Sequence, residues 1–231
     1  MSSNDVTVIL AHAAWADGSS WARVIDELRT AGQHAVAAPL PLTSLGDDVK
    51  ALDRLIERAG GSVVLVGHAY SGAVIGGARS ASVKGLVYVN GLVPEAGETV
   101  LDVFTRVAPH PQAPQVAPDA DGLIWLPEEA FGQAFAQQAS GSEQAVLAAV
   151  QRPISISCIT VPVDRPVWHD LPSWYLIGEE DRMISSENQQ FMAERIGATI
   201  ASHPLDHCPM LGAPDLVSKM ILEAVAAVAP R

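Results

Sequence analysis

Basic residues are scarce in this sequence, and so are long apolar runs. Its 14 Lys and Arg stand against 26 Asp and Glu, which gives a formal net charge of −12. Because no cluster of Lys and Arg is present to bind phosphates, we expect neither nucleic acid nor an anionic membrane as a partner. No uncharged apolar run approaches the ~20 residues that span a bilayer. Residues 1–5 lack the basic-then-apolar order of a signal peptide, so we expect a cytoplasmic protein.

Cysteine and metal-ligand patterns are also missing. Cys158 and Cys208 lie far apart without Cys-x-x-Cys spacing, so we expect free thiols. The 7 histidines do not show the helical spacing of metal ligands. The glycines of residues 72–77 fall inside a predicted helix rather than at a strand-to-helix turn, which argues against a dinucleotide site. We therefore expect no metal and no cofactor, and a small molecule as the partner.

Apolar strand patterns alternate with amphipathic helix patterns along most of the chain. This alternation predicts an α/β protein with a doubly wound, mostly parallel six-stranded sheet and helices on both faces. Residues 94–165 break the alternation with prolines and helix-like pieces, near Leu101 and over residues 128–150. The segment is too long for a loop, so we interpret it as a helical cap over the carboxyl edge of the sheet. The core would then comprise residues 1–93 and 166–231.

Residues 63–74 carry the pattern of a nucleophile elbow. A β-branched apolar run enters a glycine, and small residues then lead into a helix, as in a Gly-x-Ser-x-Gly elbow. Gly67 matches the first glycine, but Ala69 occupies the nucleophile position and Ser71 replaces the second glycine. An alanine methyl group cannot attack a carbonyl. We expect the Ser71 hydroxyl, two residues beyond the tip, to make a helix-start hydrogen bond rather than to act as a displaced nucleophile.

An acid and a histidine follow at the places where an elbow enzyme needs them. Asp181 comes directly after the predicted strand 173–177, and His207 follows the last predicted strand. Because the carboxyl ends of parallel strands share one edge, we expect both side chains to meet near Ala69. The acid would hold the imidazole in one tautomer, and His207 would act as a general base. A solvated or helix-start acid and a merely packed histidine are the alternatives.

Backbone N–H groups offer an oxyanion hole that needs no serine. One donor would be Tyr70, directly after the nucleophile position, and the other Ala13 or Ala14 in the loop after the first strand. We expect His12 to hydrogen-bond the backbone of that loop, and His68 to pack or brace the elbow turn. Several aromatic side chains could line an apolar pocket or pack within the core and cap: Trp15, Trp21, Trp125, Phe131 and Phe135.

Nearly the whole chain resembles the α/β-hydrolase superfamily. The resemblance rests on residues 11–21, 66–72, 181–184, 190–195 and 207–211. It is strongest to the small-cap group that includes plant hydroxynitrile lyases and methyl-ester esterases. The resemblance implies the acid role for Asp181, the catalytic histidine role for His207 and the nucleophile position for Ala69. Ala13 stands in place of a usual glycine, which, with Ala69 and Ser71, favours a natural variant over an engineered serine-to-alanine change.

Three functions fit these residues. In the first, an Asp181–His207 dyad acts as general base on a small, mostly apolar ester or carbonyl compound, by hydrolysis without an acyl-enzyme, lysis, elimination or cyclisation. In the second, the chain is a serine esterase carrying an inactivating alanine at position 69. In the third, it is a non-catalytic small-molecule binding protein. The cap helices also offer apolar surface for a homodimer.

Overall fold

A six-stranded sheet forms the centre of the molecule. The structure is a computed structural model that describes residues 6–229. The strands follow the order β2-β1-β3-β4-β7-β8, and every neighbouring pair is parallel. Their bounds are β1 Val6–Ala11, β2 Ala35–Ala38, β3 Ser62–His68, β4 Val83–Val89, β7 Ser173–Gly178 and β8 Thr199–His203. The predicted α/β class and doubly wound sheet are confirmed.

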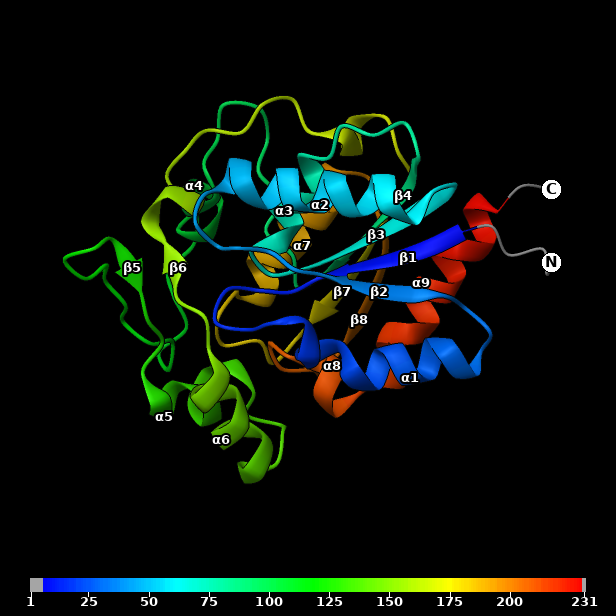
Figure 1. Ribbon diagram of the computed structural model, residues 1–231. Coiled ribbons are helices and arrows are strands. Elements are labelled where there is room, and N and C mark those ends of the chain that lie inside the picture. Colours follow the sequence, from blue (N-terminus) through cyan, green and yellow to red (C-terminus); the bar gives the residue numbers. More distant parts are fainter. Residues whose placement is uncertain (1–5, 230–231) are drawn as a thin grey trace.

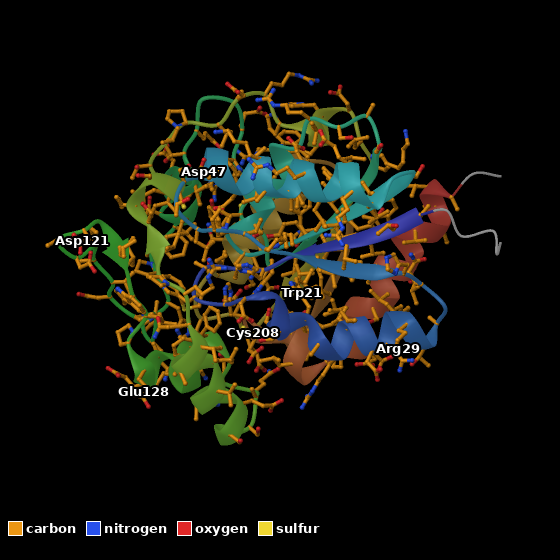
Figure 2. All side chains as sticks on the ribbon, viewed as in Figure 1. Trp21, Arg29, Asp47, Asp121, Glu128 and Cys208 are labelled. Carbon is orange, nitrogen blue, oxygen red and sulfur yellow. The ribbon has the colours of Figure 1, made fainter. Side chains whose placement is uncertain are left out.

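Helices cover both faces of this sheet, as Figure 1 shows. α2 (Leu45–Ala59) and α3 (Ser71–Gly76) lie on one face, and α1 (Ala22–Thr30) and α9 (Pro214–Val228) lie on the other. α7 (Ser186–Arg195) follows β7, and the short α8 (Pro209–Gly212) precedes α9. Side chains fill the space between the layers, among them the fully buried Trp21 of the one-turn helix η1 (Gly18–Trp21) (Figure 2). Coverage on both faces explains the apolar runs of the buried strands β1, β3, β4 and β7.

The segment between β4 and β7 contains short elements. These are α4 Val100–Phe104, β5 Leu123–Ile124, α5 Glu128–Ala130, the π-helix η2 Phe131–Phe135, α6 Gly141–Val150, β6 Ile154–Ser155, η3 Ile156–Cys158 and η4 Val167–His169. β5, β6, α5 and α6 gather at one side of the sheet, with Asp121 and Glu128 at the margin (Figures 1 and 2). The expected helix over residues 128–150 is wrong as one piece. Ser140 and Glu143 form a capping box that starts α6 afresh.

Residues 1–5, on which the signal-peptide prediction rests, lie outside the described residues. Within residues 6–229, the helices are all too short or too polar to cross a membrane.

The strand order places the candidate site. β1 has β2 on one side and β3 on the other, so the connections that leave β1 and β3 run in opposite directions along the sheet, which is the position where open α/β sheets bind ligands. The oxyanion loop follows β1 and the elbow follows β3, while the Asp181 loop follows β7 and the His207 loop follows β8. Segments far apart in the chain are therefore brought to one edge of the sheet.

Candidate active site

The elbow has the backbone of a strained strand-to-helix turn. Ala69 lies in the left-handed region with φ 49°, a conformation that costs an alanine about 1–2 kcal/mol. Its carbonyl accepts hydrogen bonds from Gly72 N (3.0 Å) and Leu92 N (2.9 Å). A Cβ added to Gly72 would lie 2.5 Å from the Leu92 carbonyl oxygen, and one added to Gly67 would lie 2.6 Å from the Ser71 carbonyl oxygen. Backbone contact therefore requires both glycines.

Asp181 and His207 form a buried pair. His207 Nδ1 lies 2.8 Å from Asp181 Oδ2, and the two residues are 2% and 3% exposed, respectively. Asp181 Oδ1 accepts from the backbone N–H of Met183 and Ile184, and Oδ2 also accepts from Gln189 Nε2. Each carboxylate oxygen thus faces only donors, so the imidazole proton belongs on Nδ1. His207 Nε2, which has no hydrogen-bond partner in the described part of the chain, is then left as the basic nitrogen.

The backbone of His207 is held from the elbow and from β4. His68 Nε2 donates to the His207 carbonyl at 2.6 Å, and the two ring centroids are 4.8 Å apart. Asn90 Nδ2 donates to the carbonyls of Asp206 (2.9 Å) and His207 (3.3 Å). Burial, together with the neighbouring His207, holds the pKa of His68 well below its ordinary value of 6.5. His68 therefore stays neutral and braces the loop that carries His207.

A second buried histidine shapes the oxyanion loop. His12 Nδ1 donates to the Ala13 carbonyl at 2.9 Å, and burial lowers the pKa of His12. The Ser71 hydroxyl donates to the His12 carbonyl. The expected helix-start hydrogen bond is therefore wrong: Ser71 instead ties the elbow helix to the oxyanion loop. Trp15 links the same loop to β5, since its Nε1 donates to the Ile124 carbonyl at 2.9 Å.

The predicted oxyanion donors lie in buried backbone at the same edge. Ala13, Ala14 and Tyr70 are 1%, 6% and 3% exposed. Among residues 6–229 we find no acceptor for the backbone N–H of any of the three. A buried N–H without an acceptor costs free energy, so an oxygen atom placed there by a ligand would be stabilised.

Aromatic rings lie against the dyad. The Phe135 ring is 5.2 Å from the His207 ring and meets Trp15 edge-on at 6.3 Å, centroid to centroid. Phe131 packs edge-on against Phe135, and both phenylalanines are fully buried. Trp125 differs, because it is 49% exposed on the protein surface. The expectation that Trp125 lines an apolar pocket or packs in the cap is not supported by this exposure.

Asn90 and Gln189 are site residues that the sequence reasoning missed. Asn90 follows β4 at the same sheet edge as the elbow, and that position was a usable signal. Gln189 lies in a polar stretch of α7, yet it is fully buried and donates to Asp181. Nothing in the helix pattern distinguishes it from its exposed neighbour Gln190.

Known proteins resemble this chain over most of its length. Residues 8–220 match the model of the alpha/beta hydrolase family. Alpha/beta hydrolase nvfD of Aspergillus novofumigatus is 25% identical over 227 residues, which cover 87% of this chain and 89% of that protein.

Two solved structures share the fold at lower identity. Polyneuridine aldehyde esterase has a TM-score of 0.84 at 17% identity, covering 95% of this chain and 98% of its own. A variant of tomato methylketone synthase I, complexed with β-ketoheptanoate, has a TM-score of 0.80 at 16% identity, covering 97% and 99%. These likenesses agree with the fold described above. Because the family model spans residues 8–220 of the 231, this chain belongs to the alpha/beta hydrolase family.

Proposed function

We propose that this enzyme uses His207 as a general base on a small, mostly apolar ester or carbonyl compound, without forming an acyl-enzyme. The observation that carries the proposal is the buried 2.8 Å pair of His207 and Asp181 beside an elbow whose tip is an alanine. The reaction would be hydrolysis by an activated water, or a lysis, elimination or cyclisation that begins with proton abstraction.

The dyad supports the base role. Asp181 orients the ring through Nδ1 and stabilises the imidazolium that forms when Nε2 takes a proton. The other contacts of Asp181 are all donated hydrogen bonds, two from backbone and one from Gln189. All four of these hydrogen bonds are donated to the carboxylate, which holds its two oxygens in place while the proton moves on the far side of the ring.

The backbone supports stabilisation of negative charge. The N–H groups of Tyr70 and of Ala13 or Ala14 are buried and lack acceptors within residues 6–229. Such donors would hold an oxyanion or enolate that develops on a substrate carbonyl. They are main-chain groups, so the absence of a hydroxyl at Ala69 leaves them intact.

The rings around the dyad support an apolar substrate. Phe135 and Trp15 lie beside His207 and the oxyanion loop, and no Lys or Arg side chain hydrogen-bonds the dyad in the described part of the chain. A β-keto acid belongs among the test compounds, since the similar tomato methylketone synthase variant was crystallised with β-ketoheptanoate.

The test compares the native chain with Ala69→Ser on short-chain p-nitrophenyl esters and on β-ketoheptanoate. His207→Ala is made in both backgrounds, and His34→Ala, which removes an exposed histidine, is the matched control. We expect the native chain to turn over at least one compound, with loss of activity in His207→Ala and unchanged activity in His34→Ala. Turnover that survives His207→Ala would contradict the proposal.

A second candidate is a serine hydrolase whose nucleophile is replaced. The left-handed φ of 49° at Ala69 favours it, because a nucleophile elbow needs that conformation and an alanine does not prefer it. In that case only Ala69→Ser hydrolyses esters, dependent on His207. Absence of turnover in both backgrounds, with ligand binding retained, would instead identify a non-catalytic binding protein.

A further inference from the structure

Asp48 is a buried carboxylate on a face of α2 that is otherwise apolar. The residue is 0% exposed, and the other buried residues of the helix are Leu45, Leu52 and Ile56. Placing a carboxylate there costs free energy unless it is well hydrogen-bonded. An apolar residue would satisfy the packing at lower cost, so the contacts of the carboxylate need an explanation beyond packing.

These contacts converge on the residue after the elbow tip. Asp48 Oδ2 accepts from the Tyr70 hydroxyl at 2.6 Å, and Oδ1 accepts from the Leu42 N–H at 2.7 Å. Cys158 of η3 places its sulfur 3.8 Å from Oδ2. One carboxylate therefore joins α2, the loop after β2, the segment between β4 and β7, and the elbow.

The proton of the Tyr70–Asp48 bond stays on the tyrosine. Burial, and then the adjacent Asp48, raises the pKa of Tyr70 far above its ordinary value. Burial raises the pKa of Cys158 to about 12, so the thiol also keeps its proton and faces the carboxylate as a donor. Tyr70 is thus the donor of a short hydrogen bond to the carboxyl group, which holds the tyrosine side chain in one orientation.

Tyr70 also carries one of the two backbone N–H groups that would hold an oxyanion. Its side chain is anchored at the hydroxyl, and its backbone follows the strained turn at Ala69. We propose that Asp48 is a positioning residue: through the Tyr70 hydroxyl it fixes the orientation of the Tyr70 N–H. The inference rests on the proposed function, because it assigns this N–H to the oxyanion hole.

The first test reads the Tyr70 amide directly and needs no substrate. The sequence has 3 tyrosines, so protein labelled with ¹⁵N-tyrosine gives a three-peak amide spectrum. Tyr70→Phe assigns the Tyr70 peak by its loss. In Asp48→Asn we expect the Tyr70 peak to move and its hydrogen exchange to accelerate, while the peaks of Tyr88 and Tyr175 stay in place.

The second test reads turnover of p-nitrophenyl acetate, by the native chain or by Ala69→Ser, whichever hydrolyses it. We expect Tyr70→Phe and Asp48→Asn each to lower kcat about tenfold with KM within about twofold, below the 10²–10³-fold loss that deleting an oxyanion donor causes. The double variant should be no worse than either single one, since both act through one bond. Tyr88→Phe, which removes a buried hydroxyl without a partner in the described part of the chain, is the control for Tyr70→Phe.

The outcomes separate this inference from the proposed function. An unmoved Tyr70 peak in folded Asp48→Asn overturns the positioning role, whatever the activity. A fall in kcat that Tyr88→Phe reproduces also overturns it, because the loss of any buried tyrosine hydroxyl would then lower kcat equally. A shifted Tyr70 peak without turnover of any compound supports the anchoring of the N–H by Asp48 and counts against the proposed function alone.

Discussion

Asp181→Asn is the substitution that most directly tests the proposal that Asp181 orients His207 as a general base. The carboxylate of Asp181 accepts four hydrogen bonds, from Met183 N, Ile184 N, Gln189 Nε2 and His207 Nδ1. An asparagine has one oxygen and one NH₂ group at the same places. If its oxygen faces the two backbone N–H groups, its NH₂ faces Gln189 and His207, which are both donors.

This contact between donors sets the expected loss of kcat and of the free energy of unfolding. His207 can relieve it only by moving its proton from Nδ1 to Nε2, which leaves Nε2 unable to accept a proton. Loss of the correct tautomer lowers kcat about 10⁴-fold in enzymes that use such a histidine as base. The clash of donors with Gln189 leaves a buried polar group unsatisfied, so we also expect the free energy of unfolding to fall by about 1–3 kcal/mol.

The assay is kcat on the compound that the native chain turns over, together with ¹⁵N chemical shifts of the histidine rings. These shifts should show the His207 proton on Nδ1 in the native chain and on Nε2 in Asp181→Asn. Asp215→Asn is the control, because it removes one exposed carboxylate and leaves the dyad untouched. If Asp181→Asn keeps more than a tenth of the native kcat with an unchanged tautomer, the carboxylate does not orient the base.

Three further predictions concern stability. Gly72→Ala should lower the free energy of unfolding, measured by urea titration, by about 1–3 kcal/mol, because its Cβ would lie 2.5 Å from the Leu92 carbonyl oxygen. Gly46→Ala is the control: its Cβ would lie in open space, so the same titration should show no loss of stability. Ala69→Gly should raise the free energy of unfolding by about 0.5–1 kcal/mol by relieving the left-handed φ of 49°, and a lower urea midpoint would contradict the strain. Burial raises the pKa of Asp48 above 3.8, so the free energy of unfolding of the native chain, relative to that of Asp48→Asn, should fall as the pH rises through the raised pKa. Urea titrations of both proteins at acidic and neutral pH measure this difference. A difference that rises with pH would contradict the raised pKa of Asp48.

The fold was predictable because its signals are local and agree with one another. Continuous apolar runs predicted buried strands, and 3.6-residue periodicity predicted the helices between them. The segment between β4 and β7 was less predictable. Its π-helix Phe131–Phe135 and the capping box at Ser140 interrupt an apolar pattern that reads as one helix from residue 128 to 150. Short-range hydrogen bonding overrode the periodicity there.

The site residues that follow strands of the parallel sheet were predictable from their order along the chain. Asp181 and His207 follow strands whose carboxyl ends meet, so the order of elements was enough to bring them together. The partners that hold them depend on tertiary contacts across many residues, as for Gln189 and Asn90. Asp48 was missed, although an acidic residue three positions after Leu45 and four before Leu52 lies in line with buried apolar residues of α2, which is the signal that could have found it.

The alanine at the elbow tip becomes understandable because the turn positions two groups, a side chain and a backbone N–H. A nucleophile elbow raises a side chain at Ala69, and the same turn aims the next N–H, that of Tyr70. If the turn served only a nucleophile, a chain without one would gain stability from a relaxed backbone or from glycine at position 69. Instead the φ of Ala69 is 49°, Gly67 and Gly72 still allow close backbone contact, and a buried carboxylate anchors the Tyr70 side chain. Under the proposed function, these features act together on the backbone N–H of Tyr70, the oxyanion donor that needs no serine.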